Sequence, residues 1–458
     1  MCSSDLELDV QPLVASGVTV KTGDTYQFSG SNISIATGAL ATPNKADGSA
    51  DTTKQIDNTN IHVLSSALVN WAFAGNTTNN VVASLANAST ISGLSGSGQV
   101  ALNALMNSAS GSGNGAGSFV QNLVSTDDVR KAGEQLRPEI NGANIQAALN
   151  VTDKVFGLVD SHLNDTHLAQ LTGKSGIATG EQPNGTGVWM QGFGFRGNQD
   201  VRKSVDGYSA DAYGFAIGAD RLVNSNTRLG GAFSYANSSI DDKGVNNGNR
   251  TQIDSYQATL YSSMLLDNWY LNGALGLGKH NYDSKRLVLG ADVNGSHEAW
   301  QYTAKVDAGR PVKVGSATFT PVASLTYSRL NQDAYTESGV GALAIRGSDT
   351  NSFRSGLGAK ALIPLHEGYV KTALELRTIW NHEFGNTEQN TTANFIGGGS
   401  EFTTSGVSTA RDGADLGASL RLSGSDNVMK QSLLLSYDAE IKDQYFSQTV
   451  LLQARFDF

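Results

Sequence analysis

Seven histidines and one cysteine are the side chains of this chain best suited to metal binding or nucleophilic catalysis. The histidines are His62, His162, His167, His280, His297, His366 and His382. They form no HExxH motif, and the spacing of His162 and His167 puts them on different sides of a helix. The lone Cys2 excludes an intrachain disulfide and a cysteine-based zinc site. GxSxG and GxxxxGK[ST] motifs are also absent. We therefore expect no enzyme activity, no metal and no cofactor.

The other candidates for chemistry are charged residues that recur at every second position of apolar segments. Lys371, Glu375 and Arg377 alternate with apolar residues between Val370 and Trp380, and Asp438 and Glu440 do the same near the end of the chain. A period of two predicts β-strands with one apolar and one polar face. We interpret these five residues as polar lining of a barrel lumen. The period alone does not tell whether the apolar face points inward, as in a soluble barrel, or outward.

The composition is compatible with a membrane barrel and argues against a helical membrane protein. The chain has 458 residues, of which 39% are hydrophobic and 16% charged, and 52 are glycine. Mean hydropathy is -0.24. We find no apolar run of about 18 residues, the length needed for a membrane helix. The formal net charge is -10 and no basic stripe is present, so we expect no nucleic-acid partner.

Twelve strands are predicted from Gly187 to the end. They are Val188–Arg196, Tyr208–Val223, Thr227–Ile240, Thr251–Leu266, Asn268–Lys285, Glu298–Val312, Ala317–Leu330, Ser352–Ile363, Gly368–Phe384, Gly413–Leu422, Lys430–Lys442 and Tyr445–Phe458. Their even number and their length favour a membrane barrel. Aromatic residues near strand ends are typical of interfacial girdles, namely Trp189, Tyr208, Trp269, Tyr270, Trp300, Trp380 and Phe458. Short turns such as Asp267–Asn268 alternate with long connections such as Gly385–Asp412. The fold class is therefore all-β, a twelve-stranded antiparallel transmembrane barrel.

The region before the barrel divides into two parts. Residues 1–124 are rich in Ser, Thr, Asn and Gly; within them, 17–28 alternates like a rung of a β-solenoid, 61–74 and 100–106 could be short helices, and 108–118 reads as a linker. The first ten residues contain neither a basic segment nor an apolar core. A barrel protein needs an export signal, so we expect the chain to begin inside a longer precursor.

Residues 125–186 are predicted to be mainly helical. Thr126 or Asp127 could cap a first helix that Pro138 ends. A longer helix is expected over 144–171, with one apolar stripe formed by Ile145, Leu149, Phe156, Val159 and Leu163. The opposite face carries Thr152, Asp153, Asp160 and Asn164. Such a helix could lie on a soluble core, or inside a barrel whose inner wall is polar.

Four segments resemble the autotransporter β-domain, the translocator of type V secretion. Gly187-Val-Trp-Met-Gln-Gly-Phe-Gly194 and the segment Val205–Arg221 are similar to its first two strands. Glu134-Gln-Leu-Arg-Pro-Glu139 and the helix 150–163 are similar to the segments that precede the barrel. The resemblance implies an outer-membrane barrel over 187–458 with a helix in its pore. It also implies that 1–124 is the remnant of a passenger carried to the cell surface.

The resemblance extends to partners and to individual residues. It implies contact with outer-membrane lipid, with the barrel-assembly machinery and with the chain's own passenger; we expect a monomer. The terminal strand, with Phe456 and Phe458, is similar to the signal that the assembly machinery reads. Some members cleave their passenger at an Asn in the lumen helix, and Asn150 is at the matching place. Here Val151 follows it, which departs from the Asn-Asn pattern, so we expect an uncleaved or externally cleaved helix.

One other function remains open. The chain could be an outer-membrane adhesin in which 1–124 and the long connections bind a partner. A diffusion porin is disfavoured, because a helix in the pore would obstruct it.

Overall fold

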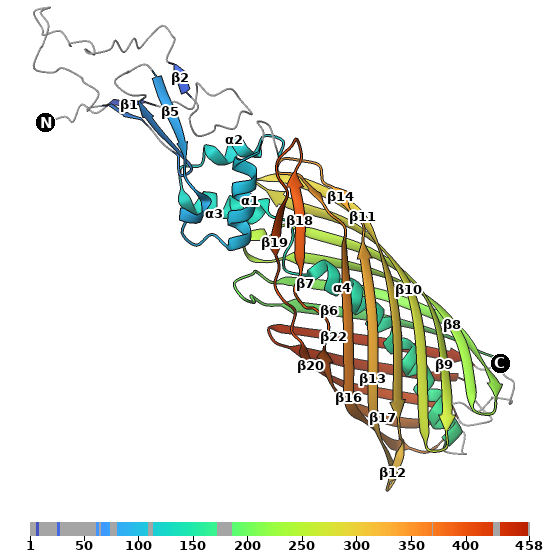
Figure 1. Ribbon diagram of the computed structural model, residues 1–458. Coiled ribbons are helices and arrows are strands. Elements are labelled where there is room, and N and C mark those ends of the chain that lie inside the picture. The colour runs from blue at the N-terminus through green and yellow to red at the C-terminus, as the bar shows by residue number, and fades with distance from the viewer. Residues whose placement is uncertain are drawn as a thin grey trace, which may run out of the picture.

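A computed structural model of the chain describes residues 6–8, 25–27, 61–63, 66–73, 80–108, 113–171, 186–368, 370–424 and 431–456. Its main body is a closed barrel of twelve antiparallel strands, as predicted (Figure 1). The strands are β6 (Thr186–Gln199), β7 (Tyr208–Asn224), β8 (Thr227–Asp242), β9 (Arg250–Leu266), β10 (Trp269–Val288), β11 (Ala291–Gly309), β13 (Ala317–Gln332), β16 (Ser348–His366), β17 (Val370–Glu383), β20 (Asp412–Gly424), β21 (Gln431–Lys442) and β22 (Tyr445–Phe456). Each overlaps one strand of the sequence prediction.

Neighbouring strands in sequence are neighbours in the wall, and the ring is closed by its two ends. β22 pairs with β6 from Tyr445↔Gln199 to Phe456↔Val188. The short strand β12 (Val312–Val314) continues the wall beyond β11 at one end and pairs with β13. Because every barrel strand has a partner on both sides, its backbone N–H and C=O groups are satisfied within the wall, as a lipid environment requires.

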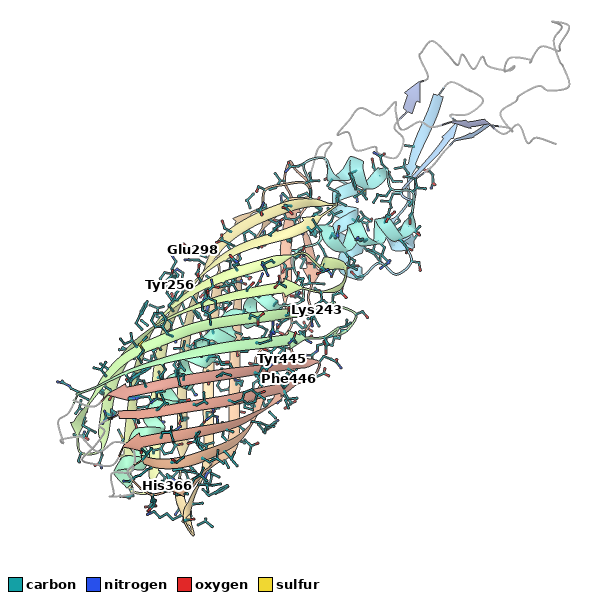
Figure 2. The ribbon with its side chains drawn as sticks, turned by 180° about the vertical axis from the view of Figure 1, so that it is seen from behind. Lys243, Tyr256, Glu298, His366, Tyr445 and Phe446 are labelled. Atoms are coloured by element: carbon teal, nitrogen blue, oxygen red, sulfur yellow. The ribbon has the colours of Figure 1, made fainter. Side chains whose placement is uncertain are left out.

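The exposed fractions of the side chains decide which face of the wall is apolar. On β11, Tyr302 is 52% exposed, whereas its neighbours Gln301 and Thr303 are 1% and 5% exposed. Leu435 on β21 is 50% exposed and Ser436 beside it is 2% exposed. Side chains line the outer surface of the wall, Tyr256 and Glu298 among them (Figure 2). The apolar face therefore points outward and the polar face inward, which is the membrane alternative.

The predicted aromatic girdle is only partly correct. Trp269, Trp300 and Trp380 are 40% to 50% exposed on the outer surface. Trp189, Tyr208 and Tyr270 are at most 3% exposed and point to the interior. These three residues occupy inward positions of their strands, so proximity to a strand end was misleading. Phe458 lies outside the described residues.

A single long helix runs through the barrel. α4 (Ala143–Leu171) lies inside the ring of strands and runs along it (Figure 1). Gly142, immediately before it, has a φ of 75°, and a β-carbon there would lie 2.6 Å from Gln389 Oε1. Only glycine fits this turn without strain. The helix predicted over 144–171 is therefore present, and it occupies the lumen rather than an outer surface.

A small domain, which we call the cap, covers one end of the barrel (Figure 1). It contains the helices α1 (Gly96–Met106), α2 (Ala116–Gln121) and α3 (Thr126–Leu136) and the 3-10 turn η3 (Ala88–Thr90). It also contains a sheet made by barrel connections, with β14 (Tyr335–Thr336), β15 (Leu343–Ile345), β18 (Asn390–Phe395) and β19 (Phe402–Ser405). Ser125 caps α3, with its Oγ accepting from the Asp127 N–H, so neither Thr126 nor Asp127 is the cap residue.

Short strands precede the cap. β1 (Leu6–Leu8) pairs in parallel with β3 (Ile61–Val63), and β2 (Thr25–Gln27), β5 (Asn80–Leu85) and β4 (Val69–Phe73) form a second sheet. The prediction of a helix over 61–74 is therefore wrong, whereas 100–106 lies in α1. Most of the proposed solenoid rung 17–28 and residues 109–112 of the predicted linker lie outside the described residues. The last residues of that linker, 116–118, belong to α2, so the linker prediction is wrong there.

Candidate functional site: the barrel lumen and its cap

One side of α4 packs against strands β6–β10, which we call the packed wall. Phe156, Val159 and Leu163 from the predicted stripe are at most 1% exposed and belong to the core shared with this wall. Ile145 packs at the edge of the same core and Leu149 is half-buried outside it. On the barrel side the core contains Phe193, Ala216, Ile253 and Tyr261. The hydrophobic effect therefore holds the helix to one side of the lumen.

A buried polar cluster reinforces this contact. His162 Nε2 lies 2.5 Å from Asp220 Oδ2, and both side chains are fully buried. Arg228 pairs with the other oxygen of Asp220, and the Tyr261 hydroxyl donates to Asp220 Oδ2 over 2.8 Å. Burying a carboxylate is costly unless it is paired and hydrogen-bonded, and here three groups satisfy it. We call this cluster the latch, because it joins α4 to β7, β8 and β9.

Aromatic stacking completes the latch. The His162 ring stacks on Trp189 with centroids 5.0 Å apart, and Trp189 Nε1 donates to the Tyr261 hydroxyl over 2.7 Å. Trp189 lies directly over Gly218 on the next strand, where a β-carbon would be 2.5 Å from the indole ring. Any larger residue at 218 would displace the indole and the histidine stacked on it.

The opposite side of α4 makes ion pairs with strands on the other half of the barrel. Asp153 pairs with Arg354 on β16 at 2.6 Å, and Asp160 pairs with Lys305 on β11. Each of these four side chains is between 17% and 25% exposed, so the pairs are partly hydrated. Both aspartates belong to the polar face that the sequence predicted.

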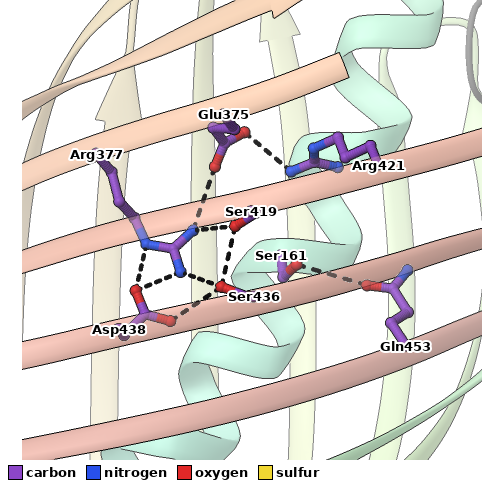
Figure 3. Close-up of polar contacts among 8 residues, drawn as sticks. All are labelled: Ser161, Glu375, Arg377, Ser419, Arg421, Ser436, Asp438 and Gln453. Carbon is purple, nitrogen blue, oxygen red and sulfur yellow. Dashed lines mark hydrogen bonds and ion pairs between the residues drawn. The ribbon is translucent and has the colours of Figure 1, made fainter. Parts of the chain in front are cut away.

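The wall facing these aspartates, which we call the polar wall, is formed by β11, β13, β16, β17, β20 and β21. Its most connected group is Arg377, which contacts Asp438 at 2.7 Å, Ser436 at 2.7 Å, Ser419 at 3.1 Å and Glu375 at 3.3 Å (Figure 3). Arg421 donates to the other oxygen of Glu375 over 2.9 Å. The structure thus brings together three of the five residues expected to line the lumen.

The other two expected residues lie nearby on the same strands. Glu440 is 7% exposed and pairs with Lys442 at 2.6 Å. Lys371 is half-buried on β17, on the strand face that carries Glu375 and Arg377. Their role as a hydrated lining remains a prediction.

A cavity of about 210 Å³ separates α4 from the polar wall. Five cationic side chains line it, Lys154, Lys305, Arg354, Lys360 and Arg377, together with five carboxylates, Asp153, Asp160, Asp415, Asp438 and Glu440. Asn150 lines the same cavity and donates from Nδ2 to the Tyr445 hydroxyl over 3.2 Å. Nothing in this geometry tests whether the chain is cut at Asn150.

The cap has an apolar core of its own and is joined to the barrel by a buried ion pair. Leu102, Leu105 and Leu136 have no exposed surface, and they belong to one core with Val293 of β11 and Phe395 of β18. Arg286 on β10 binds Glu337 through two hydrogen bonds of 2.8 and 2.6 Å.

Arg286 also explains why the segment Glu134–Glu139 has a fixed place. Its NH1 donates to the Gln135 and Arg137 carbonyls over 2.9 and 3.1 Å. Glu134 accepts from the Ser95 N–H at 2.9 Å and pairs with Arg137 at 2.8 Å. The same segment therefore holds α1, the link to α4 and the barrel wall together.

Glu139 sits where the cap meets α4. Its Oε1 accepts from the Gly142 N–H over 2.6 Å, and Asn141 next to it donates to Asp242 Oδ1 over 2.7 Å. Burial, together with the negative charge of Asp242, raises the pKa of Glu139 to about 7. The link between cap and helix therefore contains a carboxyl group that titrates near neutral pH.

Sequence reasoning found the lumen helix and its aspartates but missed the latch and the Arg286–Glu337 pair. Phe456 ends β22, and Phe458 lies outside the described residues, so their role in assembly stays a prediction.

Among the described residues, no cluster of histidine, cysteine and carboxylate side chains could hold a metal ion. No described helix is long and apolar enough to cross a membrane.

Comparison with known proteins adds a family match. The model of the autotransporter beta-domain matches residues 188–437, more than half of the chain. Among solved structures, the translocator domain of the autotransporter NalP from Neisseria meningitidis aligns with a TM-score of 0.50 at 15% identity. That alignment covers 68% of this chain and all of the NalP domain, and it supports the fold.

Curated relatives are much longer than this chain. Outer membrane protein A of Rickettsia conorii is 24% identical over 286 residues, which cover 59% of this chain and 14% of the rickettsial protein. An extracellular serine protease of Serratia marcescens is 25% identical over 338 residues, covering 72% of this chain and 31% of the protease. The chain therefore spans less than a third of either relative.

Proposed function

The chain belongs to the autotransporter β-domain family, and from this premise we propose that its barrel is an outer-membrane translocator that carries the N-terminal part of the protein to the cell surface. The observation that carries the proposal is the path of the chain. Residues before α4 fold into the cap at one end of the barrel, and α4 runs through the lumen to the end where β6 begins. Because the cap and the start of β6 lie at opposite ends of the barrel, the chain between them passes through the whole length of the pore.

In this proposal, residues 1–124 are the end of a passenger, 125–186 is the helical connection and 187–458 is the translocator. The cap then lies on the extracellular side, where the long connections at 333–347 and 385–411 are found. The barrel itself catalyses no reaction. The relative named as a serine protease supports a division of labour in which any enzyme activity belongs to a passenger.

Assembly in this proposal depends on the barrel-assembly machinery and gives a monomer. Its support is the closed wall, in which β22 with Phe456 is the strand that meets β6. We further propose that α4 stays intact at Asn150. Asn150 lies within a continuous helix, and its side chain is hydrogen-bonded to Tyr445.

The proposal is tested by display in a Gram-negative host. We would express the chain behind an export signal with an epitope before residue 66 and measure its digestion by protease added to intact cells. The epitope should be cleaved while the barrel keeps its heat-dependent gel shift. A matched chain that ends at residue 424, lacking β21 and β22, should leave the epitope protected. Protection of the epitope in cells with a correctly folded full-length barrel contradicts the proposal.

Adhesion through the barrel connections is the alternative. The sheet β14–β15–β18–β19 is built from these connections, but Leu343 and Phe395 of this sheet are buried against α1–α3. We therefore favour a role for these connections in holding the cap.

A further inference from the structure

α4 is not centred in the barrel, and cavities lie between it and the polar wall. Beside the 210 Å³ cavity, a second cavity of about 220 Å³ lies at the cap end, lined by Asn144 and Ile145 of α4 and by residues of β13 and β16. A small cavity of about 20 Å³ lies at the other end, between Asn164 and Glu375. Lys360 lines both this one and the central cavity. Three separate cavities thus lie beside α4, and each is lined in part by strands of the polar wall.

The two walls offer different partners to a polypeptide. An extended chain presents an unpaired N–H and C=O at each residue, and these groups need hydrogen-bond partners in a confined space. The polar wall supplies donors and acceptors on long side chains, such as Lys360 and Arg377, and on hydroxyls such as Ser436. The packed wall also carries polar side chains such as Thr259, but its apolar residues, Ala216 and Ile253 among them, belong to the core that already holds α4.

The charge of the polar wall also suits a passing chain. Of the charged residues around the central cavity, four cations and three carboxylates are on the polar wall itself, and α4 contributes Lys154, Asp153 and Asp160. Neither sign dominates, so a segment of either charge meets attraction and repulsion in similar measure. The latch, in contrast, gives His162 one fixed place on the packed wall.

We propose that the polar wall is the track along which the extended passenger moves, while the packed wall holds the segment that becomes α4. The inference rests on the proposed function and deepens it. It assigns one half of the lumen to the moving passenger and the other half to the segment that becomes α4. The substrate class is an extended polypeptide without a required sequence. Backbone hydrogen bonds to polar side chains of the wall solvate it during passage.

Site-specific photo-crosslinking in a stalled chain tests the assignment. The full chain, with Cys2→Ser to remove its single cysteine, would carry before residue 66 a domain locked by an engineered disulfide, which halts export. A photo-crosslinking amino acid would replace, in turn, Ser436 or Thr326 on the polar wall and Ser263 or Thr259 on the packed wall. All four side chains are inward-facing and at most 7% exposed, so the positions are matched. Heat-dependent gel migration would verify that each variant forms a barrel.

The readout is the identity of the crosslinked peptide. In the stalled chain, the polar-wall positions should capture residues before 143 at roughly fivefold or more the yield of the packed-wall positions, the population ratio that one net hydrogen bond supports. Reduction of the disulfide should release export and remove these crosslinks. Equal capture by the two walls, or preferential capture by the packed wall, overturns the track.

Failure of the track is distinguishable from failure of translocation. Surface exposure of the epitope in the chain that is not stalled measures translocation alone. If the epitope reaches the surface but neither wall captures residues before 143, the track is wrong and translocation stands. If the epitope stays inside, the proposed function itself is wrong.

Discussion

The cap and the lumen helix follow each other in the chain, yet different forces hold them. The cap buries Leu102, Leu105 and Leu136 completely in its core and is tied to the barrel by a buried ion pair. α4 is apolar on one side only, and on the other it makes hydrated pairs beside a cavity. A domain that forms outside the barrel can use apolar burial on all sides, whereas a segment inside the pore shares its space with water.

The largest effect is expected from substitution of Arg286, which should destabilise the cap but not α4. Arg286→Met leaves the Glu337 carboxylate buried without its cation, which costs about 3–5 kcal/mol. We expect the cap to unfold at lower urea concentration while α4 keeps its protection from hydrogen exchange. Lys285→Met is the matched control, since its pair with Asp292 is half exposed and contributes under about 1 kcal/mol. Equal loss in the two variants would contradict the role of the buried pair.

The apolar core of the cap gives the next effect. Leu102→Ala removes buried methyl groups and leaves a cavity, so we expect the cap to lose about 3 kcal/mol of unfolding free energy. Val124→Ala, at a side chain that is 78% exposed, should change it by less than about 0.5 kcal/mol. Urea unfolding monitored by proteolysis of α1–α3 measures both. A similar small loss for the two variants would mean that the core does not hold the cap.

Glu139 should make the junction of the two regions sensitive to pH. Its pKa is raised to about 7, so the folded state binds a proton more tightly than the unfolded chain does. Stability of the cap should therefore be highest below the ordinary glutamate pKa, fall by about 3 kcal/mol as pH rises toward 7, and then level off.

Glu139→Gln should remove most of this dependence and make the cap more stable than the unsubstituted cap at pH 8. Cap unfolding between pH 4.5 and 8 measures it. An unchanged pH profile in the variant would show that another group titrates.

The smallest effect belongs to the polar side of α4. Asp153→Asn or Asp160→Asn replaces one partner of a hydrated pair, and each should weaken protection of α4 from hydrogen exchange by about 1 kcal/mol or less. Added salt should weaken the unsubstituted pairs in the same direction and leave the cap core unaffected. A loss of several kcal/mol from either variant would mean that α4 is held as tightly on its polar side as the cap is, and the contrast between the two regions would fail.

Local patterns accounted for the barrel and the helix, because a period of two and an apolar stripe each repeat over many residues. Short segments were less informative. The apolar residues of 61–74 suit a helix or a strand equally, and the structure has β3 and β4 there.

The latch and the Arg286–Glu337 pair could not be predicted in this way. His162 and Asp220 are 58 positions apart, and Arg286 and Glu337 are 51 apart. No repeat connects either pair; the fold alone makes them neighbours. The inward orientation of Trp189 had a weak signal, since it shares its strand face with Gln191.

The order of these contacts along the chain has a mechanical consequence. Anything that pulls on the strands before α1 at the cell surface first loads the cap. From there the force passes through the cap core to Val288 and Val293 of the β10–β11 hairpin and into the wall. α4 comes after the cap in the sequence and is shielded from this tension. The cap therefore transfers a pulling force at the surface to the barrel wall, so that the helix in the pore carries little of it and stays in place.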